Sequence, residues 1–453
     1  MGGKMNVLKA NPIAGYGIMP AMKRSCTPAL LVLLTAMVVL VPLVQAREPD
    51  WNYSSPDSVI GGVAVSSKGD LVAAAAEKVL FFTGTGTLLG KEPFGNTLVM
   101  TPDGKYTAAE YFSMLYFFKN PLPAGTADQQ KATKLWEYEL TQKIRSLSIS
   151  NDGSTLVAQT LGHDVFIFNT KTAVPKGNND EIDIQVKISA NGRYIIGISQ
   201  TRLHSYSKNG EITRTSDMTT FSLPHTMLLT STGTSAVFND GQAVRSVSTS
   251  NGKERWIGRG AGYVTSLSMT PAVSTVIAGT ETGNIEAFNA KGNLSWTFAA
   301  NPEHRQASGI TCTALSDNGA VIAAGTADGR ILFLNGKGEL TDSFTGKEYI
   351  RHIAVSADGS TIVAASDYTI WAFTSGTSSR PLPVTTTAVP SVLTTAGTQV
   401  PVSTPSPEGT TPATITEIPT TWSVIRTATQ SSSSLITLAG SFILALFVLA
   451  GKR

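Results

Sequence analysis

The sequence predicts an all-β fold, a single β-propeller of four-stranded antiparallel blades. Its clearest unit is Ile310–Phe344, in which four β-type runs alternate with tight-turn residues. The turns are Ser316–Gly319, Ala327–Gly329 and Asn335–Gly338. Their Gly, Asn and Asp residues tolerate the positive φ that such turns require. The runs are rich in β-branched and aromatic residues, which favour pleated strands. One such unit therefore predicts one four-stranded sheet.

This unit repeats along the chain at a spacing of about 40 residues, the range of four-stranded propeller blades. One member of the series, Val264–Phe298, has Thr270–Val273 in place of a glycine-containing first turn. No unit shows a helical period, which excludes a helical solenoid. Eight blades are predicted, or seven if one degenerate unit is not a complete sheet. The other first turns are Ser66–Gly69, Thr101–Gly104, Ser150–Gly153, Ser189–Gly192, Thr230–Gly233, Ser316–Gly319 and Ser356–Gly359.

The last unit lacks its outer strand, because Thr/Pro-rich sequence follows its third strand, Thr369–Phe373. A candidate strand stands before the first unit. Asp50–Tyr53 lies before the turn Ser66–Gly69 at almost the same spacing at which the outer-strand segment Leu135–Tyr138 lies before the turn Ser150–Gly153. Both segments contain a Trp. We expect this N-terminal strand to complete the last blade and close the ring without leaving an open edge.

Part of the repeat resembles a known family. Gly283–Phe298 contains a third strand, a turn and a Trp-bearing outer strand in that order, and it resembles the repeat of PQQ-like (quinoprotein-type) β-propellers. The Ser-x-Asp-Gly turns resemble those of WD40-type repeats. The resemblance covers about Trp51–Phe373, and its motifs imply the fold rather than the function. The whole layout is similar to surface-anchored WD40/PQQ-like propeller proteins of methanogenic archaea.

The two ends predict an exported, anchored protein. Residues 1–46 have the features of a signal peptide with a long basic leader, an apolar run and a small-residue cleavage site at Val44–Ala46. Translation could begin at Met19 or Met22, and an uncleaved anchor is the alternative. Residues 431–451 predict a transmembrane helix, with the basic pair 452–453 as its cytoplasmic end. Processing of this tail to a lipid anchor is a second alternative.

Between the propeller, residues 47–375, and the anchor lies a Thr/Pro/Ser-rich segment, residues 376–430. Such a composition cannot bury a core, and it predicts an extended stalk. Two sequons, at Asn52 and Asn293, predict N-glycosylation of the exported part.

Charge and cysteine content restrict the class of partner. The formal net charge is +3, but six basic residues and no acid lie in the leader and the basic end, so the exported part carries −3. A slightly acidic surface argues against a nucleic-acid partner. After cleavage Cys312 is the only cysteine left, so no intramolecular disulfide is possible. We interpret Cys312 as a small buried apolar residue.

The sequence shows no pattern for catalysis, metal binding or cofactor binding. PQQ-dependent dehydrogenases, which the repeat resembles, hold Ca²⁺ with carboxylate and amide oxygens beside the quinone, and many have adjacent cysteines. The chain has no adjacent cysteine pair, and small or apolar residues dominate the innermost strands. Its five histidines lie in different units without metal-ligand spacing.

Binding is therefore predicted, and loops on a rigid scaffold usually provide it. We expect a non-catalytic, monomeric propeller that binds an envelope protein or a surface glycan. A PQQ-type dehydrogenase and a propeller for envelope assembly are the alternatives. The candidate residues lie on the face that carries the second turns and the links between blades: Glu303, His304, Arg305 and Gln306 in the longest charged link, His163 and Asp164, and Asp367 and Tyr368. Long loops at 120–134 and 171–183 are predicted on the opposite, first-turn face.

Overall fold

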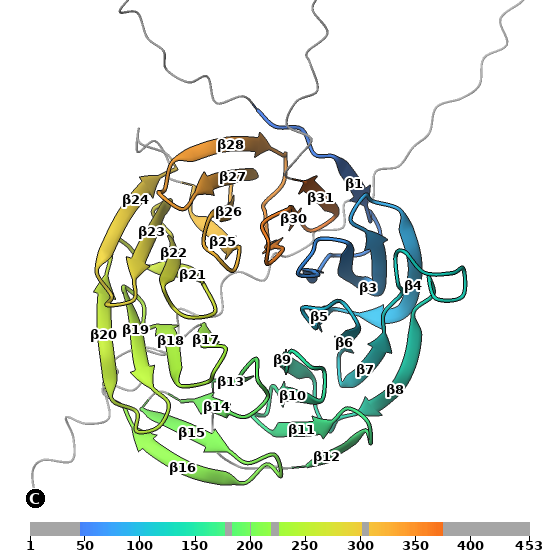
Figure 1. Cartoon of the computed structure of the whole chain (residues 1–453), viewed down its shortest axis with the longest axis horizontal. Coiled ribbons are helices and arrows are strands. Elements are labelled where there is room, and N and C mark those ends of the chain that lie inside the picture. Colours follow the sequence, from blue (N-terminus) through green and yellow to red (C-terminus); the bar gives the residue numbers. More distant parts are fainter. Residues whose placement is uncertain (1–45, 177–183, 200, 219–225, 301–307, 375–453) are drawn as a thin grey trace, which may run out of the picture. The chain divides into compact units, whose positions relative to one another are not determined.

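A computed structural model describes residues 46–374, except 177–183, 200, 219–225 and 301–307. The predicted signal peptide, stalk and transmembrane helix lie outside the described residues. Within these ranges every regular element is a β-strand, and no helix is long and apolar enough to cross a membrane. The strands form eight sheets arranged in a ring (Figure 1).

The blades are numbered here in chain order. Blades 1 to 7 contain β2–β4, β5–β8, β9–β12, β13–β16, β17–β20, β21–β24 and β25–β28, and blade 8 contains β29–β31 with β1. The strands are β1 (Trp51–Ser54), β2 (Gly62–Val65), β3 (Leu71–Thr83), β4 (Leu88–Gly95), β5 (Thr97–Met100), β6 (Tyr106–Tyr111), β7 (Met114–Lys119), β8 (Thr133–Glu139), β9 (Ile144–Ile149), β10 (Thr155–Thr160), β11 (Val165–Asn169), β12 (Val174–Lys176), β13 (Gln185–Ile188), β14 (Ile195–Ile198), β15 (Arg202–Tyr206), β16 (Ile212–Asp217), β17 (Met227–Leu229), β18 (Ser235–Asn239), β19 (Ala243–Ser248), β20 (Glu254–Arg259), β21 (Val264–Met269), β22 (Thr275–Thr280), β23 (Asn284–Asn289), β24 (Leu294–Ala299), β25 (Ile310–Leu315), β26 (Val321–Thr326), β27 (Arg330–Asn335), β28 (Leu340–Thr345), β29 (His352–Val355), β30 (Thr361–Ala365) and β31 (Thr369–Thr374).

In blade 1 a single long strand, β3, supplies both middle positions. Its residues 72–75 pair with β2, and its residues 77–82 pair with β4. Glu77 has φ +58°, close to the +56° of Phe112 in the tight turn between β6 and β7. We therefore interpret Glu77 as the point at which β3 folds back. All eight repeat units are blades, which confirms the eight-bladed prediction and excludes the seven-bladed alternative.

The predicted ring closure is confirmed. β1 pairs antiparallel with β31 in the register Trp51↔Ala372 to Ser54↔Thr369, so the N-terminal strand is the outer strand of blade 8. The preceding residues reach blade 7, because Ala46 forms a parallel bridge with Ser343 and the Arg47 N–H donates to the Ser343 carbonyl at 2.7 Å. The N-terminal end of the propeller is thus bonded to the last two blades, 7 and 8.

Glycines allow the repeated first turns to form. In seven blades the fourth turn residue is a glycine with φ between +68° and +75°, and its N–H donates to the carbonyl of the first turn residue. In blade 6 Val273 stands at this position and takes φ +58°. The Val273 N–H still donates to the Thr270 carbonyl, at 2.9 Å. The turn therefore keeps its geometry where the sequence signature is lost.

Tryptophans of the outer strands hold neighbouring blades together. Trp51, Trp136 and Trp296 each donate from Nε1 to a backbone carbonyl of the next blade, at 2.9, 2.7 and 3.2 Å. A side chain on Gly86 or Gly338 would overlap the Trp51 or Trp296 ring, at 2.5 Å from ring atoms. The glycine thus makes room for the ring, and the apolar core lies between the blades in separate clusters rather than at one centre.

The second residues of the first turns form the rim of the central channel: Ser67, Pro102, Asn151, Ala190, Ser231, Pro271, Asp317 and Ala357. At six of the eight junctions between blades, the N–H of the second or third turn residue donates to the carbonyl of the second turn residue in the next blade, at 2.7 to 3.3 Å. Among the described residues, the two junctions without such a bond begin at Pro102 and Pro271. At four of the six bonded junctions the donor is the second turn residue itself, and proline has no N–H to donate from that position.

One predicted loop needs correction. Within the excursion predicted at 171–183, residues 174–176 form β12, the outer strand of blade 3, which pairs with β11, and residues 177–183 lie outside the described residues. Short strands with a proline, here Pro175, give a weak sequence signal. The other predicted excursion is confirmed, since residues 120–132 connect β7 and β8.

Candidate binding face

The predicted site residues divide into two groups. Glu303, His304, Arg305 and Gln306 lie outside the described residues. His163 and Asp164 lie in the β10–β11 turn of blade 3, and Asp367 and Tyr368 lie in the β30–β31 turn of blade 8. Both turns are second turns, on the predicted face. The two pairs are not adjacent, because blades 1 and 2 separate them on the shorter way around the ring (Figure 1).

A patch of aromatic and charged side chains surrounds Asp367 and Tyr368. The Arg351 guanidinium forms an ion pair with Asp367 and lies over the Tyr349 ring, with Cζ 5.1 Å from the centroid. The Asp367 hydrogen bond raises the pKa of Arg351. The Tyr349 and Tyr368 side chains remain 44% and 42% exposed. We call Val59, Tyr349, Arg351, Asp367 and Tyr368 the Tyr368 patch.

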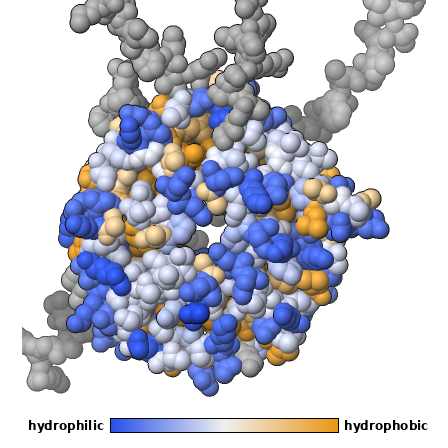
Figure 2. Space-filling model, viewed as in Figure 1, coloured by the Kyte–Doolittle hydropathy of each residue, from blue (hydrophilic) through white to orange (hydrophobic). Residues whose placement is uncertain are grey.

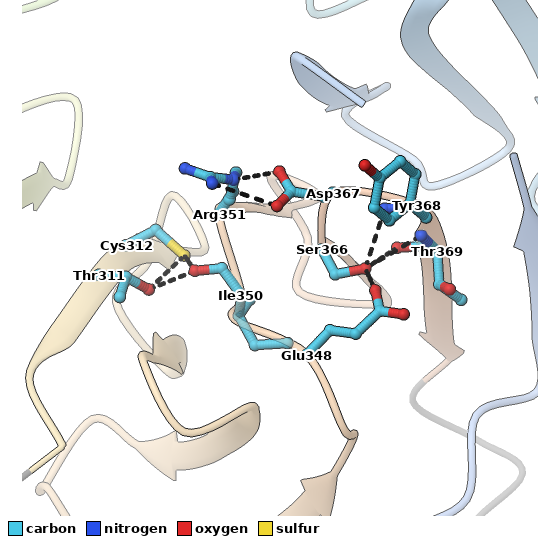
Figure 3. Close-up of polar contacts among 9 residues, drawn as sticks. All are labelled: Thr311, Cys312, Glu348, Ile350, Arg351, Ser366, Asp367, Tyr368 and Thr369. Carbon is cyan, nitrogen blue, oxygen red and sulfur yellow. Dashed lines mark hydrogen bonds and ion pairs between the residues drawn. The ribbon is translucent and has the colours of Figure 1, made fainter. Parts of the chain in front are cut away.

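Backbone contacts fix this patch. The Ser366 hydroxyl donates to the Glu348 carboxylate and accepts the Tyr368 and Thr369 N–H groups, at 3.2 and 3.0 Å (Figure 3). The link from β1 to β2, which carries Val59, donates to the Asp367 carbonyl from Ile60 at 2.7 Å. The β30–β31 turn, which carries Tyr368, is therefore hydrogen-bonded to both neighbouring links, at Glu348 and at Ile60. A fixed aromatic side chain of this kind is a suitable anchor for a partner.

A second patch lies on the same face at blades 2 and 3. The Lys143 ammonium lies 5.4 Å from the centroid of the exposed Phe112 ring. The Leu161 N–H donates to the Lys143 carbonyl at 2.8 Å, and Leu161 is also exposed. His163 and Asp164 follow in the same turn, where His163 takes φ +74°. We call Phe112, Lys143, Leu161, His163 and Asp164 the Phe112 patch.

Exposed apolar side chains concentrate on this face. Of the twelve large apolar side chains that are exposed in the described part of the chain, six lie in its second turns and links: Val59, Phe112, Leu161, Tyr263, Tyr349 and Tyr368. Sequence reasoning identified only Tyr368. Phe112 and Leu161 directly follow the strands β6 and β10, and Phe112 sits in a two-residue turn that the sequence does not separate from its strands. Val59, Tyr263 and Tyr349 lie singly in the links between blades, where one apolar residue gives no pattern. Exposed apolar groups on one face of a rigid scaffold are typical of protein-binding surfaces.

A buried carboxyl lies beneath the Phe112 patch. Glu110, at the end of β6, is 4% exposed, and its Oε2 has no hydrogen-bond partner among the described residues. Burial raises the pKa of Glu110 to about 7, while Lys143 and the Phe112 N–H oppose the shift. The carboxyl therefore titrates near neutral pH.

The central channel is apolar. A cavity of ≈ 550 Å³ lies between the innermost strands and is lined mainly by Val, Leu, Ala and Met side chains. The space-filling view shows its opening at the centre of the ring (Figure 2). No Asp or Glu occurs in the described innermost strands, and no group of three potential metal ligands occurs among the described residues. These strands do not offer the carboxylates that a quinone-bound Ca²⁺ requires.

The innermost strands also carry polar groups, and Ser268 and Thr313 line the cavity. Lys187 on β13 occupies the position, two residues before the first turn, at which Ala64, Val99 and Leu228 line the cavity. Burial lowers its pKa, and its Nζ lies 3.4 Å from the Leu147 carbonyl. Sequence reasoning missed this lysine because its strand neighbours are apolar. Cys312 is on β25, and burial raises the pKa of its thiol to about 11, so the protonated thiol predominates at neutral pH.

Both predicted glycosylation residues lie on the surface. Asn52 is exposed on the outer strand β1, and Asn293 is exposed in the turn between β23 and β24. Neither lies in a second turn or in a link between blades.

Comparisons with known proteins agree with this fold. A family model described as outer membrane protein assembly factor BamB matches residues 199–348, and a model described as WD domain, G-beta repeat, matches residues 338–373. No curated protein matches the chain. The protein is thus a β-propeller with repeats of the WD40 and PQQ-like kinds, as the sequence predicted.

Solved structures share the same architecture. The C-terminal WD40 domain of Sif2 is 13% identical, with a TM-score of 0.60, over 72% of this chain and 99% of that chain. Sqt1 of Chaetomium thermophilum, bound to the N-terminus of the ribosomal protein L10, is 14% identical, with a TM-score of 0.59, over 72% of this chain and 100% of that chain. At such identities the likeness shows the fold alone.

Proposed function

We propose that the protein is a non-catalytic binding module that captures an envelope protein with its second-turn face, outside the membrane to which it is anchored. The observation that carries the proposal is the concentration of exposed aromatic and apolar side chains on this face, beside charged groups. Aromatic and Arg side chains are the usual anchors of protein interfaces. The Sqt1 structure, in which a propeller holds a protein N-terminus, supports a protein partner.

Loss of the exposed rings tests the binding face. We expect Tyr349→Ala with Tyr368→Ala to weaken capture of the envelope partner at least tenfold, because buried aromatic anchors contribute roughly 2 kcal/mol or more each. The matched control is Leu135→Ala with Leu294→Ala, two apolar side chains of similar exposure on outer strands. Capture is measured by pull-down from detergent-solubilised envelope, with quantification of the retained protein. Equal capture by both double variants would contradict the proposal.

Export and anchoring are tested separately. If the leader is removed and residues 431–451 span the membrane, protease added to intact cells releases a propeller-sized fragment, since the Thr/Pro-rich stalk is open to cleavage. A version that lacks residues 431–453 is expected in the medium instead. Recovery of the full-length protein in the soluble cytoplasm would contradict this topology, whatever the propeller binds.

A further inference from the structure

A second hollow lies on the first-turn face, at the seam between blades 4 and 5. It has a volume of ≈ 550 Å³, within the range of roughly 300–1,000 Å³ typical of small-molecule sites. Blade 4 contributes Arg193, Ser205 and Arg214, and blade 5 contributes Ser250 and Arg255. The hollow is on the first-turn face of the propeller, whereas the Tyr368 and Phe112 patches are on the second-turn face.

Three arginines without an ion pair converge on this hollow. The described residues contain ten arginines, of which five form ion pairs with Asp or Glu. Three of the remaining five, Arg193, Arg214 and Arg255, line the hollow, and no Asp or Glu lines it. Two acids lie near in the sequence, but Asp217 forms an ion pair with Arg202 and Glu254 forms one with Arg245. The positive charge of the hollow is therefore not neutralised by the described residues.

Backbone carbonyls orient two of these guanidinium groups. The Arg214 Nη1 donates across the seam to the Ser250 carbonyl, and the Arg255 Nη2 donates to the Thr234 carbonyl at 3.3 Å. Each bond uses one N–H of a group that has five. The free donors remain available as planar forks, which match the two oxygens of a carboxylate or a sulfate.

The other walls suit a sugar. Ser205, Thr213 and Ser250 line the hollow. The Thr213 hydroxyl donates to the Ser205 carbonyl and the Ser250 hydroxyl is bonded to that of Ser248, so both oxygens can still accept a hydrogen bond. Tyr194 adds a ring that is 43% exposed. Hydroxyls can exchange hydrogen bonds with a saccharide, and an aromatic face can stack on a pyranose ring. We propose that this hollow binds an anionic saccharide, whose carboxylate or sulfate groups pair with Arg193, Arg214 and Arg255.

The test is a calorimetric titration of the detergent-solubilised full-length protein with three trisaccharides: trigalacturonate, sulfated maltotriose and neutral maltotriose. We expect at least one anionic trisaccharide to bind and neutral maltotriose not to bind. Arg214→Ala with Arg255→Ala is expected to weaken binding at least tenfold, because charge-assisted hydrogen bonds are lost. The matched control, Arg145→Ala with Arg259→Ala, removes the two other described arginines without an ion pair and should bind as the wild type does.

The proposal would be overturned if neither anionic trisaccharide bound, or if Arg214→Ala with Arg255→Ala bound as the wild type does. It would also be overturned by binding of neutral maltotriose as tight as that of the anionic sugars, by an equal loss in the control variant, or by inorganic phosphate or sulfate binding as tightly as the trisaccharides. Trigalacturonate and sulfated maltotriose separate a carboxylate ligand from a sulfate ligand. Unchanged melting temperatures of both double variants show that the fold is intact. None of these outcomes depends on the partner of the second-turn face.

Discussion

Removal of the N-terminal strand is expected to destabilise the propeller by on the order of 5 kcal/mol, because the deletion takes the outer strand from blade 8 and exposes the edge of β31. Trp51 stacks on Phe82 with 5.3 Å between ring centroids, and Tyr53 meets the same ring at 5.1 Å. Burial of each large side chain contributes roughly 1.5–3 kcal/mol. The backbone pairs with β31 contribute about 1 kcal/mol each.

The measurement compares the melting temperature of the propeller with and without Arg47–Tyr53. Trp51→Phe is an intermediate variant that keeps the stack on Phe82 and loses the hydrogen bond to the Gly84 carbonyl, with an expected cost of about 1 kcal/mol. An added peptide of residues 46–54 should raise the melting temperature of the deleted form in a concentration-dependent way. An unchanged melting temperature on deletion would show that β1 does not close the ring.

The free energy of unfolding is expected to fall by about 3 kcal/mol as the pH rises from below 4.5 to above 7, because of Glu110. Burial raises the pKa of this carboxyl from 4.5 to about 7 in the folded protein. Between these values the unfolded chain has lost the proton and the folded protein still holds it, so a rising pH favours unfolding. Above about pH 7 both forms are ionised, and the loss is complete.

Glu110→Gln removes this titration. We expect the variant to be more stable than the wild type at pH 8, by up to about 3 kcal/mol, and similar to it at pH 4.5. The measurement is urea unfolding at a series of pH values. The control is Glu281→Gln, an exposed carboxylate on the same face, which should follow the wild-type profile. A wild-type profile that rises between pH 5 and 7, with no effect of Glu110→Gln, would contradict the assignment.

The repeat signal was strong enough to predict the blades from the sequence. Each first turn needs a residue that accepts positive φ, and a glycine after Ser-x-Asp/Asn marks that need directly. The closing strand was also predictable, since the last unit ended one strand early and a Trp-bearing segment preceded the first. The outer strand β12 was missed because its three residues contain Pro175 and little apolar pattern.

The candidate site was predictable only in part. Loop length and polarity directed attention to His163, Asp164, Asp367 and Tyr368, and the structure places all four on the predicted face. It does not bring them together, because the order of blades around the ring, rather than distance along the chain, separates them. Phe112 and Leu161 were missed because an aromatic or apolar residue directly after a strand has the same sequence signature whether it points into the core or out of a turn.

The sequence by itself therefore determined the fold class and the way the ring closes, since both follow from local turn chemistry and strand period repeated along the chain. It predicted eight blades or seven, and the structure decided for eight. Only the tertiary structure decided which side chains share a surface. The meeting of Arg193 and Arg214 with Arg255 across a seam, and the approach of Lys143 to the Phe112 ring between blades 3 and 2, depend on how one blade packs against the next. Contacts of this kind join residues of different repeats, and the pattern within one repeat contains no information about them.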